Sequence, residues 1–133
     1  MGMREDIQAL CEKNQFMAYI GMELAELEAD RVVFQLTARP EHLNPYEMVH
    51  GGVMYTMADC ASGTAARTDG RRYVTLSSSF NFIRSGMPGE ILRAEAVVRH
   101  RGRSTCYVSA SVTDKDGKLL SSGDFTFFCL DNK

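Results

Sequence analysis

The sequence predicts an α+β fold in which an antiparallel sheet packs on one long helix. Four consecutive segments with alternating side chains fill the second half of the chain, at residues 72–84, 90–101, 104–114 and 118–130. They follow a helical segment, Gly51–Arg67, that is rich in small residues. Strands joined by short turns pair antiparallel, so this helix is expected to supply the second layer of the core.

Length and composition narrow the class of protein. A chain of 133 residues is expected to form a single domain, 1–133, and its 44% hydrophobic and 24% charged content is ordinary for a soluble protein. The net charge of -2 argues against a nucleic-acid partner, which needs an excess of cations. No apolar run approaches the roughly 20 residues that cross a bilayer. The charged N-terminal segment does not resemble a secretion signal, so we expect a cytoplasmic protein with no membrane partner.

The cysteines and histidines show no pattern of a metal site. The four cysteines lie far apart in the sequence, and the three histidines have no metal-ligand spacing to them. Without a secretion signal, we expect reduced thiols and no bound metal.

The N-terminal third is expected to contain one helix and two strands. Within residues 1–16, the segment 4–16 should form a short amphipathic helix, because its inward positions recur at helical spacing: Ile7, Leu10, Cys11 and Asn14. Residues 18–28 have a weaker pattern, which we interpret as a strand that ends in a turn at Asp30. Residues 31–38 have the pattern of a half-buried strand, in which successive side chains point to opposite faces. One face carries Val32, Phe34, Leu36 and Ala38, and the other carries Val33, Gln35 and Thr37.

A loop with two prolines leads into the central helix, 51–67. Its buried stripe is expected at spacings of three and four residues: Met54, Met57, Ala58, Ala61 and Ala65. The small residues around this stripe allow a sheet to approach the helix closely.

The four later strands each present one apolar face. In 90–101 it is Leu92, Ala94, Ala96 and Val98, and in 104–114 it is Cys106, Val108, Ala110 and Val112. Asp116-Gly117 predicts a two-residue hairpin turn. Strict alternation in 72–84 places one set of polar residues on a common face: Thr75, Ser77, Ser79 and Asn81.

The segment NPYEMVHGG, residues 44–52, ends at the start of the central helix. The first backbone N–H groups of a helix have no partner, and the helix dipole makes this end positive. Gly51 and Gly52 let a ligand approach the backbone, so the segment could hold the oxyanion that forms when a carbonyl is attacked. Read alone, it could equally be an ordinary helix start after a loop.

Asp59 lies in the middle of this helix, where aspartate is unfavourable. It is either a solvent-facing carboxylate or a catalytic acid. Nine residues of helix separate it from His50, which corresponds to about 13 Å, so the two cannot touch within one chain. If both act on one substrate, the acid must come from a second copy in an antiparallel dimer.

These residues together resemble a known family. Asn44, then His50-Gly51-Gly52, then Asp59 and the strand ending NFIRSG resemble the PaaI-like (phenylacetate-degradation-related) acyl-CoA thioesterases of the hot-dog fold, over residues 22–130. The resemblance implies a curved antiparallel sheet wrapped around the central helix. It also implies homodimers, which often pair into tetramers, with active sites at the dimer interface.

The resemblance assigns roles to the motif. Asn44 and the Gly51 N–H, with Gly52 in the same turn, would polarise the thioester carbonyl. His50 would lie beside the sulfur. Asp59 of the other protomer would act as general base or as nucleophile. A hydroxyl on the next strand would position the water; Thr75 and Ser77 both qualify, and we favour Thr75.

The phosphates of coenzyme A would need cations. The turn RHRGRS offers them around Gly102, at Arg99, Arg101 and Arg103, and Arg84 is a second candidate. A solvated basic turn is the alternative. The predicted function is hydrolysis of an acyl- or aryl-acyl-CoA to the free acid and CoA, with no cofactor beyond the CoA of the substrate. A hot-dog 3-hydroxyacyl thioester dehydratase and a non-catalytic acyl-CoA-binding module are the alternatives.

Overall fold

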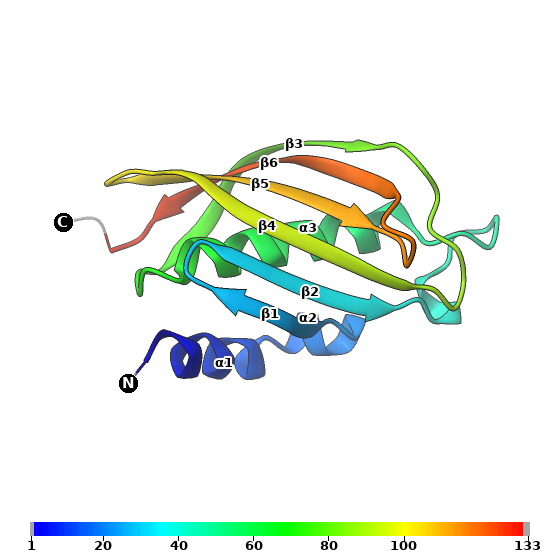
Figure 1. Cartoon of the computed structure of the whole chain (residues 1–133), viewed down its shortest axis with the longest axis horizontal. Helices are drawn as coiled ribbons and strands as arrows, with labels where there is room; N and C mark the ends of the chain where they lie inside the picture. The colour runs from blue at the N-terminus through cyan, green and yellow to red at the C-terminus, as the bar shows by residue number, and fades with distance from the viewer. Residues whose placement is uncertain (1, 132–133) are drawn as a thin grey trace.

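A six-stranded antiparallel sheet curves over one long helix in the computed structural model, which describes residues 2–131 (Figure 1). The spatial order of the strands is β1-β2-β4-β5-β6-β3. Their bounds are β1 Glu23–Glu28, β2 Arg31–Thr37, β3 Tyr73–Phe82, β4 Ile91–Arg101, β5 Thr105–Thr113 and β6 Leu119–Cys129. The helices are α1 Met3–Lys13, α2 Gln15–Ile20, a short 3₁₀ turn Pro40–His42, and α3 Gly51–Arg67. None of the helices within residues 2–131 has the length and apolarity that a bilayer span requires.

The central helix α3 is buried by the sheet as predicted, which confirms the hot-dog architecture. The whole predicted stripe is buried: Met54, Met57, Ala58, Ala61 and Ala65. From Ala61 to Ala66 every residue is buried, so this half of the helix has no solvent-facing side. Small side chains make this possible, because larger ones would hold the sheet away from the helix axis.

The predicted strands 72–84, 90–101, 104–114 and 118–130 are confirmed to within two residues at each end. The apolar face predicted for β5 is buried, and so are the first three members of the face predicted for β4, while Val98 is partly buried against the core. On the outer face of β2, Val33 is also buried, contrary to simple alternation. Its cross-strand neighbours Glu26 and Glu95 form ion pairs with Arg31, and these long side chains flank it.

Two local predictions were wrong. Residues 18–20 belong to the helix α2, which Asn14 caps by accepting a hydrogen bond from the Met17 N–H, and Gly21 ends it in the left-handed conformation. The strand therefore begins only at Glu23. The β5–β6 turn is not a two-residue turn, because only Gly117 has positive φ. The Gly117 N–H bonds to the Asp114 carbonyl, which leaves a three-residue loop.

The face assignment in β3 was also wrong, because the strand contains a bulge. Thr75 pairs with Phe127, but Ser77 pairs with Thr126, so Leu76 is the extra residue. Thr75 therefore shares the inner face with Ser78 and Phe80, whereas Ser77, Ser79 and Asn81 face outward. Sequence alternation cannot locate such a bulge.

The two edges of the sheet differ. At β1, α1 lies alongside the strand (Figure 1), and the Arg4 guanidinium donates to the Leu27 carbonyl at 3.0 Å. At β3, the described residues provide no pairing partner beyond β6, and the strand exposes large apolar side chains, such as Leu76 at 61% and Phe82 at 56%. An open apolar edge of this kind is a typical pairing surface for a second chain.

Gly123 sets the contact between β6 and β3. A Cβ atom at this position would lie 2.2 Å from the Ser79 carbonyl oxygen and 2.7 Å from the Phe80 ring. We expect Gly123→Ala to push β3 away and to lower the free energy of unfolding by about 1–3 kcal/mol, the usual cost of overpacking. Thermal and urea unfolding measure this change. The control is Ser122→Ala on the same strand, and a Gly123→Ala protein as stable as this control would contradict the close-approach argument.

Candidate active site

His50 caps the N-terminus of α3. Its Nδ1 accepts a hydrogen bond from the Gly52 N–H at 2.8 Å, and its extended backbone is typical of an N-cap. Because Nδ1 is an acceptor, the proton of the neutral ring lies on Nε2. The side chain is exposed, so this Nε2–H is available to a ligand.

Asn44 organises the loop before the helix. Its Oδ1 accepts hydrogen bonds from the N–H groups of Tyr46 at 2.9 Å and Met48 at 3.1 Å. The Asn44 N–H also donates to the Met48 carbonyl, and Glu47 between them has a φ of 63°. These contacts fix which end of the amide is oxygen. Only the Nδ2 donors of Asn44 then remain for a ligand, because no acceptor for them lies within residues 2–131.

A pocket of about 240 Å³ opens beside the first turn of α3. Gly51, Phe82 and Arg84 are among the residues that line it. A Cβ at Gly51 would lie 3.1 Å from the Phe82 ring, so glycine lets β3 close over the helix start. Gly51 and Arg84, which the sequence analysis predicted as site residues, thus line the same pocket. Phe82 lines it too, although it was not predicted. Nothing in the sequence marked Phe82, because its contact with Gly51 arises from the fold.

Asp59 points toward β3 from the middle of α3. The Thr75 hydroxyl donates to Asp59 Oδ1 at 2.8 Å, across the inner face of the bulged strand. This carboxylate is half-buried and has no ion-pair partner within the described part of the chain. Of the two hydroxyls that the sequence offered, the structure brings Thr75 to Asp59, and Ser77 faces the other side of the sheet.

The cysteine beside Asp59 is no alternative nucleophile. Burial, together with the charge of Asp59, raises the pKa of the Cys60 thiol to about 12. It is therefore protonated at neutral pH and unreactive. All four cysteines are free thiols, and no group of three or more His, Cys, Asp or Glu in residues 2–131 could hold a metal ion.

Arg101, which the sequence suggested as a phosphate ligand, already has partners within its own chain. Its Nη1 donates to the Ala66 carbonyl at 2.8 Å and to Asp69 at 2.7 Å, and its Nη2 donates to Asp30 at 2.7 Å. The guanidinium is needed here because the C-terminal carbonyls of α3 lack helical partners. Gly102 and the exposed Arg103 follow at the tip of the β4–β5 turn, whose carbonyls accept bonds from Arg71.

Within one chain these groups lie at three levels along α3. His50 and Gly51 stand at the N-terminus, Asp59 in the middle, and the Gly102–Arg103 turn near the C-terminus. The helix has 17 residues, which corresponds to about 25 Å. One chain therefore holds two separate groups of polar atoms, one around Gly51 at the helix start and the other at the Asp59–Thr75 pair.

Comparison with known proteins shows the family of this chain. Residues 46–121 match the family described as the thioesterase superfamily. The acyl-coenzyme A thioesterase PaaI of Escherichia coli is 25% identical over 88% of this chain and 84% of its own. Its solved structure superposes with a TM-score of 0.94 over 98% of this chain and 95% of that chain, at 22% identity. A 1,4-dihydroxy-2-naphthoyl-CoA hydrolase of Listeria monocytogenes is 31% identical over 76% of this chain and 84% of its own.

A hypothetical thioesterase of Streptococcus pneumoniae is a further structural relative. Its complex with coenzyme A has a TM-score of 0.81 and is 28% identical, over 85% of this chain and 88% of that chain. Two of its alanine mutants, of an aspartate and of a threonine 16 positions later, have also been crystallised. Asp59 and Thr75 are separated by the same 16 positions. By its family match, its fold and its residue pattern, this chain belongs to the thioesterase superfamily, as a PaaI-like hot-dog thioesterase.

Proposed function

We propose that this thioesterase hydrolyses acyl- or aryl-acyl-CoA thioesters to the free acid and CoA, at sites that two chains share. The observation that carries the proposal is the separation of two complementary half-sites on one helix. The cradle around Gly51 offers donors to a developing oxyanion, and the Asp59–Thr75 pair offers a base. Neither half can hydrolyse a thioester efficiently without the other.

A second copy would complete each site by pairing at β3. This strand is the open edge, and it exposes apolar side chains at Val74, Leu76 and Phe82. Antiparallel pairing of two β3 edges about a twofold axis would continue the sheet and place two α3 helices side by side in opposite directions. Asp59 of one copy would then face the helix start of the other.

The reaction would proceed by attack of water on the thioester carbonyl. Thr75 holds Oδ1 of Asp59, which leaves Oδ2 to take a proton from the water. The Gly51 N–H and the Asn44 amide of the second copy would donate to the oxyanion. When the carbon–sulfur bond breaks, the thiolate would leave beside the His50 Nε2–H and take up the proton that Asp59 removed from the water, which returns Asp59 to its carboxylate form. We assign Asp59 the base role because this geometry holds one oxygen and frees the other.

Coenzyme A as the leaving group is supported by two features. A relative from S. pneumoniae has been crystallised with coenzyme A. In this chain, the exposed Arg84 lies at the pocket beside Gly51, where it could bind a phosphate. In the antiparallel dimer, the Gly102–Arg103 turn of the other copy would approach the same end of the helix. That turn is a second candidate for phosphate contact.

We expect Asp59→Asn to retain the fold and CoA binding but to lose turnover. The asparagine keeps the shape and accepts the Thr75 hydrogen bond, but it cannot take a proton. The loss of base assistance should lower kcat by about 100-fold or more. Thiol release from short, medium and aromatic acyl-CoAs measures kcat, and a near-wild-type value would reject Asp59 as the base. Absence of hydrolysis by the wild-type protein on the whole panel would favour the binding-module alternative.

The bulge provides a matched pair of variants in β3. Thr75→Val removes the hydrogen bond to Asp59. A hydrogen bond to a charged group contributes about 1.5 kcal/mol, so its loss should lower kcat roughly tenfold. Ser77→Val, two residues away on the outer face, should leave kcat unchanged. Equal effects of the two variants would mean that the strand, and not the Thr75 hydroxyl, matters for turnover.

Two inactive variants should restore each other if the site is shared. Asp59→Asn removes the base, while Asn44→Asp removes the Nδ2 donors but keeps the oxygen that organises the loop. When the two variants are refolded together in equal amounts, half of the dimers are mixed. Each mixed dimer has one intact site of two, so about a quarter of wild-type activity should return. Each variant refolded alone is the control. Verified mixed dimers no more active than these controls would show that the site lies within one chain.

A further inference from the structure

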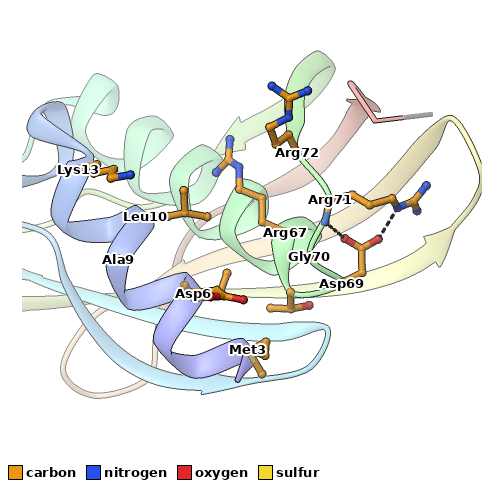
Figure 2. A pocket seen from close by; sticks show the side chains of 12 residues that line it. Met3, Asp6, Ala9, Leu10, Lys13, Arg67, Asp69, Gly70, Arg71 and Arg72 are labelled. Atoms are coloured by element: carbon orange, nitrogen blue, oxygen red, sulfur yellow. Dashed lines mark hydrogen bonds and ion pairs between the residues drawn. The ribbon is translucent and has the colours of Figure 1, made fainter. Parts of the chain in front are cut away.

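A second pocket lies between α1 and the α3–β3 loop (Figure 2), about two turns of α3 beyond Asp59. Its volume is about 560 Å³, within the range of pockets that bind organic molecules. Met3, Ile7 and Leu10 of α1 form an apolar wall. None of the residues assigned to the thioesterase site lines it.

Three of the six charged residues that line the pocket are neutralised by ion pairs. Asp69 accepts from Arg71 at 2.9 Å, and Arg72 pairs with Asp131 at 2.7 Å. Figure 2 shows the Asp69–Arg71 contacts on the side away from α1. These four groups are therefore already paired, Asp69 also with Arg101, and they need no further ligand.

Arg67 is different. It projects from the last turn of α3 and is half-buried, yet it forms no ion pair with any carboxylate in residues 2–131. Its one protein hydrogen bond there runs from Nη2 to the Tyr73 carbonyl at 2.9 Å. Burial lowers the pKa of this guanidinium, and the nearby charge of Asp59 offsets only part of this effect. The negative end of the α3 dipole offsets only part of such a charge.

The helix makes room for this side chain. A Cβ at Gly63 would lie 3.0 Å from Arg67 Nη1, so the guanidinium rests against the helix where a side chain is missing. Glycine inside a helix is unfavourable, and here it keeps Arg67 at the pocket. Lys13 of α1 also has no ion pair in the described chain, and Figure 2 shows Lys13, Leu10 and Arg67 around the same hollow. The carboxylate of Asp6 also lines the pocket, so the unpaired groups leave an excess of one positive charge.

We propose that this pocket binds a free organic carboxylate with an apolar body, whose carboxylate pairs with Arg67 and whose chain lies on the α1 wall. A carboxylate supplies the counter-charge that Arg67 lacks, and a planar guanidinium pairs with it through two parallel hydrogen bonds. The apolar wall selects against small hydrated anions. This site does not depend on the proposed hydrolysis, and binding alone tests it.

Isothermal titration of the intact protein with octanoate, and with octanamide as its neutral counterpart, tests the proposal. We expect binding of octanoate, weaker or absent binding of octanamide, and a fall of about tenfold or more in octanoate affinity for Arg67→Met. Arg72→Met is the matched control, because this arginine lines the same pocket but already pairs with Asp131. Its octanoate affinity should stay within twofold of wild type.

A second variant keeps the test decisive if Arg67→Met folds poorly. Leu10 is 47% exposed on α1, so Leu10→Glu should not disturb folding, and its negative charge should repel octanoate and lower the affinity about tenfold. Thermal unfolding verifies each variant. The proposal is overturned by any of three results: no octanoate binding at millimolar concentration, equal binding of octanamide, or unchanged affinity in folded Arg67→Met and Leu10→Glu.

Discussion

The close packing of α3 against the sheet is the constraint on which the rest of the structure depends. Ala58, Ala61 and Ala65 are fully buried, so the sheet backbone can lie near the helix axis. Both ends of the helix are fixed as well, by the His50 cap and by Arg101 on the last carbonyls. A helix held in this way cannot slide, and its polar groups therefore stay at fixed positions along the sheet.

This rigid placement explains how Asp59, an acid in an otherwise apolar helix, is held in contact with a hydroxyl on the sheet. Asp59 meets Thr75 only because β3 bulges at Leu76, which turns Thr75 inward while the next hydroxyl, Ser77, faces out. The same strand is the open edge of the sheet, where its side chains stay exposed. The base of the proposed reaction thus lies beside the surface at which a second chain would bind.

The two ends of α3 have opposite partial charges and therefore suit ligands of opposite charge. The positive N-terminus, with Gly51 and the Asn44 amide, is open and suits an oxyanion that forms during reaction. The negative C-terminus is surrounded by cations, of which Arg101 is fully engaged with carbonyls and carboxylates. Arg67 lies at the same end without a carboxylate partner in residues 2–131, which is the physical reason to expect an anion there.

The sequence by itself determined the architecture and the position of the NPYEMVHGG segment at the start of α3. Periodicity identified α3 and the four later strands, because buried faces repeat with the period of the element, and helix geometry alone separated His50 from Asp59. Its alternation pattern missed the short helix α2, which Asn14 caps and Gly21 ends, the three-residue turn at Gly117, and the bulge at Leu76. Only the tertiary structure chose Thr75 over Ser77, brought Phe82 onto Gly51 and left Arg67 unpaired, because each depends on what another part of the chain places opposite.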